Sequence, residues 1–515
     1  MWGGGQELFD IDEPIPLLPR AKVQVDEEEN RRQKEESVGE LLKTVENVSI
    51  AIPEWFADPP SICEVPEELT EGSNGAYIPK VVCIGPLFDS KRKTDRMARL
   101  EHYKWCCVRK FIVGGLHPPA AVGTSESEAW SPAVHEPLLR ECMDTMTRLL
   151  PRIRASYNRM SSSKDTSDEE LATNVLLDGC FILQCLLKYT RMAKRSSGEG
   201  NDEDDDWAQL IGRKWVWGTV KRDLLVLGNQ VPFFVIHKLF KHLGRKSKSN
   251  SYDGERDGDN DILLYGGLQL FSSFHPRPLH ASPIARHDVH HLLHLFYLSI
   301  DLPRSSPWHR DSTRGQGPPQ RKSALPPDLT WWAPSAKDLD AAGVRIRARD
   351  DGTTTSFLDV KFHRGVLEIP PLKLSDYSEA LFRNLIAFEQ TYPLTPGRIT
   401  TYAILMDCLL KTDEDVRLLH QSGVLVNHMN DERKYAATGF FSRLCAEART
   451  SANRNHPADV MEEVVRYHRG RWPRWRAALV TNPWVTTSLV ASAVLLGLTV
   501  LQTYYTAVAY YKPTK

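Results

Sequence analysis

Four histidines lie close together and could carry metal chemistry: His287, His290, His291 and His294. Their spacing of three and four residues places all four on one side of a helix, where neutral imidazoles can bind zinc or copper. The opposite face of this helix would be apolar, so the histidines are expected to face solvent. One helix alone does not close a metal site, and no HExxH motif or cysteine ligand lies nearby. The pattern favours an exposed polar face without a metal or other cofactor, with metal binding as the alternative.

Asp178 is the one charged residue in an apolar run, residues 171–187 (LATNVLLDGCFILQCLL). A helix that is apolar nearly all round is typical of a buried position, where a carboxylate needs a partner. Asp178 is therefore predicted to form an ion pair or a helix cap inside the protein. A catalytic carboxylate is the alternative.

Asn229, Gln230 and Pro232 interrupt a second apolar stretch, residues 222–240 (RDLLVLGNQVPFFVIHKLF). Proline lacks a backbone donor and disfavours a helical residue before it, so a break or kink is expected there. The amides of Asn229 and Gln230 could satisfy the backbone groups that the break frees. A contact with a ligand is the alternative.

Signatures of enzymes are missing from the sequence. It contains no glycine-rich phosphate loop, no GxSxG elbow and no metalloprotease motif. We therefore predict no enzyme activity and assign no catalytic residues. The alternative is an enzyme with an unfamiliar site, in which Asp178, Asn229 and the helix of His287 to His294 converge.

A transmembrane helix is predicted for residues 484–505. About 20 apolar residues span a bilayer core, and residues 477–511 carry no formal charge. The residues expected to contact lipid are Trp484, Leu489, Val494, Leu495, Leu496, Leu498, Val500 and Leu501. Those expected at the two interfaces are Arg471, Trp472, Arg474, Trp475, Arg476, Tyr504 and Tyr505.

The arginines before this segment predict its orientation. Because positive charge favours the cytosolic side, the bulk of the chain should be cytosolic, as in a single-pass tail-anchored protein of the plasma membrane or an endomembrane. The bilayer is then one partner. Ala493 and Gly497 form a small-xxx-small pair that could support weak self-association.

Composition restricts the other partners. The 65 Lys and Arg residues balance 66 Asp and Glu residues in a chain of 515, giving a net charge of -1. Such a balance predicts no bulk attraction to nucleic acid. An unknown protein is therefore the expected partner, and the nine cysteines, without a CxxC pair, are read as reduced thiols.

The remaining patterns predict a mainly α fold. Residues 138–150, 378–390 and 400–410 have helical spacing, whereas 344–349, 357–362 and 366–369 resemble strands of a small antiparallel sheet. The predicted architecture is a body like a helical bundle, with this β element and the C-terminal membrane helix. Its predicted parts are a charged N-terminal arm with a short helix (1–50), a helical part (51–301), a Pro/Arg/Ser-rich loop (302–328), a part with the sheet and further helices (329–470) and the membrane helix (484–505).

Several runs, in their order, resemble the plant family called domain of unknown function 247 (DUF247, UPF0481-like). They are residues 76–86 (AYIPKVVCIGP) followed by His102-Tyr103-Lys104, 176–183 (LLDGCFIL), 223–240, 367–390 with LEIPPL and LFRNLIAFEQ, and 401–427. The likeness extends from about residue 61 to the C-terminus. One departure is Leu87-Phe88-Asp89, where the family often has Tyr-His-His.

The resemblance implies a plant, membrane-associated protein of uncharacterised biochemistry, without accepted catalytic residues. Some grass members are associated with self-incompatibility, a recognition process, but the resemblance alone does not assign that role to this chain. Resemblance and residues together lead us to expect a membrane-anchored, non-enzymatic recognition or scaffold protein.

Overall fold

The computed structural model describes most of the chain after residue 59. The chain divides into residues 1–59 and 60–515, and in the first unit only Arg32 is described. The described residues are 32, 60–65, 70, 73, 75–116, 131–157, 167–195, 214–244, 258–274, 289–300, 334–349, 356–393, 395–427, 436–446, 456–470 and 483–511. Apart from Arg32, the predicted N-terminal arm thus lies outside them, as does the loop at 302–328. Residues 60–470 are called the body below.

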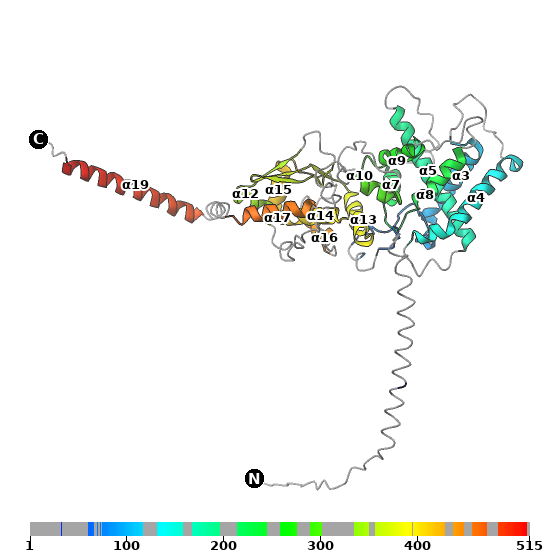
Figure 1. Ribbon diagram of the computed structural model, residues 1–515, viewed down its shortest axis with the longest axis horizontal. Helices are drawn as coiled ribbons and strands as arrows, with labels where there is room; N and C mark the ends of the chain where they lie inside the picture. Colours follow the sequence, from blue (N-terminus) through cyan, green and yellow to red (C-terminus); the bar gives the residue numbers. More distant parts are fainter. Residues whose placement is uncertain are drawn as a thin grey trace, which may run out of the picture. The chain divides into compact units, whose positions relative to one another are not determined.

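The first half of the body is built around helix α5, Asp168–Arg195. Its apolar run is buried on all sides, because α3, α4, α8 and α9 pack against it (Figure 1). The prediction of a buried helix is confirmed. The described helices of this half are α2 (Asp89–Arg92), α3 (Asp95–Gly114), α4 (Pro132–Ala155), α5, α7 (Lys214–Asp223), α8 (Phe233–Gly244), α9 (Gly258–Leu270) and α10 (Leu292–Ile300).

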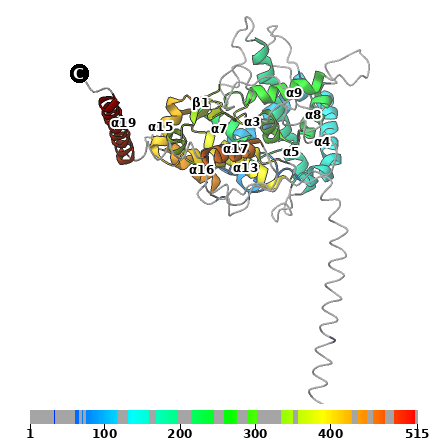
Figure 2. The same ribbon diagram turned by 60° about the vertical axis from the view of Figure 1, so that its left-hand side comes forward.

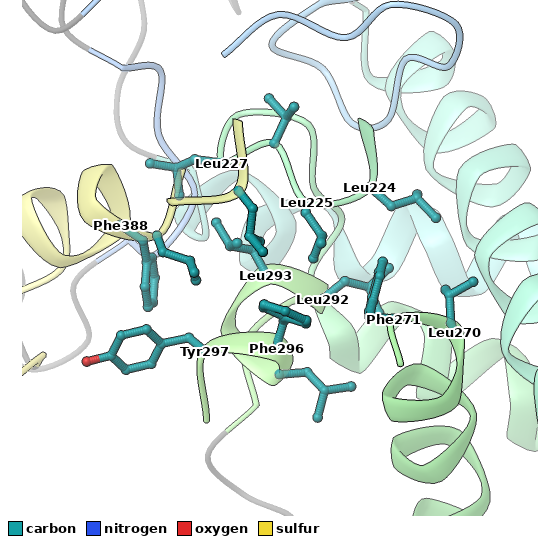
Figure 3. Close-up of a cluster of buried hydrophobic side chains, with 14 of the residues drawn as sticks. Leu224, Leu225, Leu227, Leu270, Phe271, Leu292, Leu293, Phe296, Tyr297 and Phe388 are labelled. Atoms are coloured by element: carbon teal, nitrogen blue, oxygen red, sulfur yellow. The ribbon is translucent and has the colours of Figure 1, made fainter. Parts of the chain in front are cut away.

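The predicted break in the second apolar stretch is also confirmed. Helix α7 ends at Asp223 and α8 begins at Phe233, directly after Pro232, so residues 224–232 are not helical. Three leucines of this connection, Leu224, Leu225 and Leu227, point into the apolar core beside α10, as Figure 3 shows. Their burial fixes the connection between the two helices.

A three-stranded sheet follows in the second half, in the order β1-β3-β2. Strands β2 (Lys361–His363) and β3 (Val366–Ile369) form the expected antiparallel hairpin, whose turn residues Arg364 and Gly365 both have positive φ. Strand β1 (Arg345–Ala348) instead pairs parallel with β3, on its other edge. The prediction of a purely antiparallel sheet is therefore wrong, since β1 is not joined to β3 by a hairpin.

A second, two-stranded sheet was not predicted. Strand β4 (Leu372–Leu374), after the two prolines that end β3, pairs parallel with β5 (Leu425–Asn427). Three helices separate the strands in sequence, as a parallel pair requires. Strands of three residues carry too little periodicity to be detected in a sequence.

The helices of the second half match the predicted spacing closely. Helix α13 covers Ser378–Thr391 and α14 covers Arg398–Leu409. The other helices of this half are α12 (Ala336–Ala341), α15 (Asp413–Gln421), α16 (Ala436–Cys445) and α17 (His456–His468). Helix α14, labelled in Figure 1, packs against α13, α16 and α17, and Figure 2 shows the last three close together.

The last helix, α19, covers Pro483–Tyr511 and has the character predicted for the C-terminal segment. Two described helices are long and apolar enough to cross a membrane, at 168–191 and 487–508. The first belongs to the core helix α5, and 89% of its most apolar stretch is buried, whereas none of the corresponding stretch of the second is buried. The two helices have similar composition but opposite surroundings.

Candidate functional site

The segment of residues 76–86, called the signature segment below, crosses the interior of the body without forming a strand. Val82, Cys83 and Ile84 are fully buried, so their backbone polar groups have no access to water. A buried backbone group without a hydrogen bond is costly, and these groups need partners from elsewhere. Side chains from five helices and from the connection after α7 supply partners to the backbone groups of the segment.

Asp178 on α5 is the centre of a buried ion cluster. Its Oδ1 accepts hydrogen bonds from Lys104 Nζ at 2.7 Å and from Arg92 at 3.0 Å, and its Oδ2 accepts from Arg92 and from Gly85 N, both at 2.8 Å. Asp89 and Glu101, less deeply buried, complete the cluster. The predicted buried ion pair is present, with two cations rather than one.

The N–H donors of Arg92 and Lys104 and the acceptor sites of Asp178 are all used. Arg92 places its five N–H groups on Asp89, Glu101, Asp178 and the Gly85 carbonyl, and Lys104 places its three on Glu101, Asp178 and the Cys83 carbonyl. Burial by itself would raise the pKa of Asp178, but the charges and hydrogen bonds of Arg92 and Lys104 outweigh it and lower this pKa. The carboxylate is thus charged and fully engaged, which leaves no lone pair for a substrate.

A second carboxylate holds the middle of the signature segment. Asp223, at the end of α7, accepts through Oδ2 the backbone N–H groups of Lys80, Val81 and Val82 at 2.8, 2.7 and 3.2 Å. The neighbouring Arg222 pairs with Asp223 and donates to the carbonyls of residues 75, 76 and 78. Arg222 therefore binds carbonyl groups at the start of the segment, and Asp223 binds N–H groups in its middle.

Amide side chains bind further backbone groups of the signature segment and of the connection after α7. Asn229 accepts from Ile84 N at 2.7 Å and donates to the carbonyls of Val82 and Asp223 at 3.0 and 2.9 Å. Gln230 donates to the carbonyls of residues 224 and 226, both at 2.8 Å. The structural role predicted for these two amides, at the break before Pro232, is the one the geometry supports.

Asn384 on α13 connects the signature segment to the second half of the body. Its amide donates to the Ala76 carbonyl at 3.0 Å, and its oxygen accepts from Leu227 N at 2.9 Å. One side chain therefore joins three parts of the chain that are far apart in sequence.

Glu389, also on α13, is a further buried carboxylate. It accepts the backbone N–H groups of Ile399 and Thr400, in the first turn of α14, together with the hydroxyls of Thr400 and Tyr297. A carboxylate at a helix N-terminus satisfies otherwise unpaired donors. Burial nevertheless raises the pKa of Glu389.

The histidines correct the sequence analysis. Helix α10 begins only at Leu292, so His290 and His291 precede it and the predicted single helical face does not form. His291 is fully buried and His294 is 7% exposed, so the expectation that they face solvent is wrong. His287 lies outside the described residues.

Packing against α13 explains the burial of these histidines. The rings of His291 and His294 lie 5.4 and 5.3 Å from the ring of Phe388, and His291 Nε2 donates to the Ser61 carbonyl at 3.1 Å. Burial and the neighbouring imidazoles lower the pKa of both rings, that of His294 to about 3. In the described part of the chain, no group of three or more His, Cys, Asp or Glu residues is placed to hold a metal.

The structure brings Asp178, Asn229 and His291 into one region and buries all three among the residues that it describes. Asp178 and Asn229 accept hydrogen bonds from the adjacent backbone N–H groups of Gly85 and Ile84. His291 is two residues before Leu293, whose backbone N–H donates to the side chain of Gln230, the residue after Asn229. Asp178, Asn229 and His291 are at most 1% exposed. A shallow hollow beside α4 is lined by other residues, Pro137, Arg140, Glu141, Asp144, Thr147 and Arg148.

Sequence reasoning missed the partners of Asp178. Lys104 lies on α3 in an apolar stripe, between Tyr103 and Cys107, and a lysine in such a stripe was a usable signal. Asn384 and Glu389 likewise interrupt apolar residues of α13. Arg92 is in the short helix α2, where the sequence carries no comparable signal.

The membrane residues divide into two groups. Trp484, Leu489, Val494, Leu495, Leu496, Leu498, Val500 and Leu501 all lie exposed on α19, as do Tyr504 and Tyr505. Arg471, Trp472, Arg474, Trp475 and Arg476 lie outside the described residues, so their interfacial role stays a prediction.

Comparison with known proteins identifies relatives over most of the chain. The model of a family described as plant protein of unknown function, DUF247, matches residues 62–498. UPF0481 protein At3g47200 of Arabidopsis thaliana is 27% identical over 472 residues, which cover 88% of this chain and 87% of that protein. Putative UPF0481 protein At3g02645, from the same plant, is 29% identical over 187 residues, covering 36% of this chain and 34% of that protein. No solved structure matches the chain.

Replacing the central carboxylate tests the ion cluster. Asp178→Asn leaves Arg92 and Lys104 buried without their main counter-charge, and breaking such a buried pair costs roughly 3–5 kcal/mol. We expect urea unfolding of the detergent-solubilised protein to show a loss of this size, or no folded protein. Glu136→Gln, in the exposed pair with Arg140, is the matched control and should change stability by less than about 1 kcal/mol. Equal, small effects would show that the cluster contributes little.

The buried histidines predict a pH dependence. Because their folded pKa values are depressed, the unfolded chain binds protons below about pH 6.5 and the folded chain does not, so stability falls as the pH drops toward 3. Each such histidine adds a slope of about 1.4 kcal/mol per pH unit. Urea unfolding between about pH 6 and pH 4.5 measures how the free energy of unfolding changes with pH. His294→Gln should reduce this slope by the contribution of one proton. The control is His102→Gln on the exposed side of α3, and an equal reduction in both variants would contradict this assignment.

Proposed function

The chain belongs to the DUF247 family of plant proteins of unknown function, and from that premise we propose that it is a membrane-tethered recognition or scaffold protein without catalytic activity. In this proposal, α19 crosses the plasma membrane or an endomembrane once, and the body stays on the cytosolic side. The body presents its surface to another protein. The balanced charges of the chain favour a protein over a nucleic acid as this partner.

The observation that carries the proposal is the exposure of α19. Over residues 487–508 none of the helix is buried, and Leu495, Leu496 and Val500 are 65%, 70% and 63% exposed. An exposed apolar surface of this size is unfavourable in water, and a bilayer core accepts a predominantly apolar helix of about 20 residues. Lipid is therefore the environment that suits the helix.

Charged and aromatic residues support the orientation. Arg471, Arg474 and Arg476 precede the helix in the sequence, and Lys512 and Lys515 follow it. The larger positive charge on the N-terminal side favours a cytosolic body. Trp484 at one end, with Tyr504 and Tyr505 near the other, suits the two interfaces.

The state of the buried polar groups supports recognition over catalysis. Asp178, Asp223, Asn229 and Glu389 bind backbone groups or buried cations of the same chain, so using one of them on a substrate would remove a contact that the fold needs. A tether would instead raise the local concentration of the body at one surface, which strengthens binding to partners there.

Charges placed in α19 test the anchor. Lysine at the centre of a membrane helix costs about 2.5–3.5 kcal/mol per residue, so Leu496→Lys with Leu498→Lys should move the full-length protein from the carbonate-resistant membrane pellet to the supernatant. Ile78→Lys with Val134→Lys, at two exposed apolar positions of the body, is the matched control and should stay in the pellet. Wild-type protein in the supernatant would refute the anchor.

The same preparation tests recognition separately from anchoring. A biotin ligase fused to the full-length chain should label a reproducible set of proteins beyond those labelled by a fusion carrying α19 alone. Equal labelling by the two fusions would show that the body adds no binding partner. It would refute the recognition role but not the anchoring.

A further inference from the structure

The polar side chains of α19 gather on one face of the helix. At 100° per residue, six of them fall within an arc of about 100°. They are Ser488, Ser492, Thr499, Gln502, Thr503 and Thr506. Gly497 lies on the opposite side of the helix, with Ala493 about 40° away from it. The helix thus has a hydroxyl and amide face opposite the small-xxx-small pair.

Most hydroxyls on this face are satisfied within the helix. Ser492, Thr499, Thr503 and Thr506 each donate to the carbonyl four residues earlier, at 2.7–2.8 Å. Hydroxyls bonded in this way can enter lipid and allow close approach of another helix. They make the face compatible with both lipid and a helix.

Gln502 differs from these hydroxyl residues. Within the described part of the chain its amide has no hydrogen-bond partner, although it carries two N–H donors and a carbonyl acceptor. In the predicted span of residues 484–505 it lies about 11 Å from the midpoint, still inside a hydrocarbon core that extends about 15 Å on each side. An unpaired amide at that depth is costly, so a partner within the membrane would be favoured.

We propose that two copies of the chain pair in the membrane through this face, with their Gln502 amides hydrogen-bonded to each other. This inference rests on the proposed anchoring of α19. Copies inserted with the same orientation hold Gln502 at the same depth, and an amide is both donor and acceptor, so it is complementary to itself. An unrelated helix would have to carry a matching polar group at that depth, which a second copy always does.

The opposite face supplies the matched control. A Cβ added at Gly497 would meet no atom within 4 Å, so a larger side chain there is tolerated by the isolated helix. Gly497→Ile would therefore disturb only pairing through the small-xxx-small face. Gln502→Leu removes the amide and leaves the helix more apolar, so it does not weaken insertion.

Energy transfer between two fluorescent fusions of the full-length chain, measured in membranes against expression density, tests the pairing. An interhelical hydrogen bond in a membrane contributes modestly, so Gln502→Leu should weaken dimerisation about 3- to 20-fold, and Gly497→Ile should leave it unchanged. The inference is overturned if the wild-type copies do not pair, if Gln502→Leu pairs like wild type, or if Gly497→Ile abolishes pairing.

Carbonate extraction of the same membranes separates the two proposals. Wild-type and Gln502→Leu proteins should both remain in the pellet. Retention with pairing that does not depend on Gln502 refutes only the dimer, whereas release of the wild type refutes the anchor and the dimer together.

Discussion

The body depends on how a buried, irregular backbone obtains its hydrogen bonds. Residues 76–86 cross the interior without a neighbouring strand, and carboxylate, amide, guanidinium and ammonium groups take the place of a strand's backbone. Such groups are costly to bury unless every donor and acceptor is used. Asp178, Arg92 and Lys104 meet that condition, since the backbone they bind also completes their own hydrogen bonding.

This constraint links parts of the chain that are remote in sequence. Asp178 comes from α5, Asp223 from the end of α7 and Asn384 from α13, yet all three bind the one segment or the connection beside it. The helices therefore have to pack in one arrangement before the segment is satisfied, because a partly satisfied polar network is unfavourable. Most of the segments that resemble the family supply or receive these hydrogen bonds. Their polar residues therefore stabilise the fold.

Much of this could be predicted from local patterns. The apolar run around Asp178 and the interruption at Asn229 to Pro232 indicated a buried helix, its need for an ionic partner, and a break stabilised by amides. The rest depended on contacts between distant residues. Neither the parallel pairing of β1 nor the choice of Arg92 as partner leaves a local periodicity. The prediction that the histidines share an exposed helical face was wrong for two reasons. A helical wheel assumes that all the residues are helical, but α10 starts after His291. In addition, α13 and its neighbours bury both faces of α10.

Hydrogen–deuterium exchange of the full-length protein in detergent, read by mass spectrometry, tests this account most directly. Irregular backbone normally exchanges quickly, because its amides lack regular partners. If side chains hold the signature segment, the amides of Val81, Val82, Ile84 and Gly85 should exchange as slowly as those of the buried helix α5. Fast exchange of these four amides, with α5 still protected, would contradict the claim that buried polar side chains organise the body.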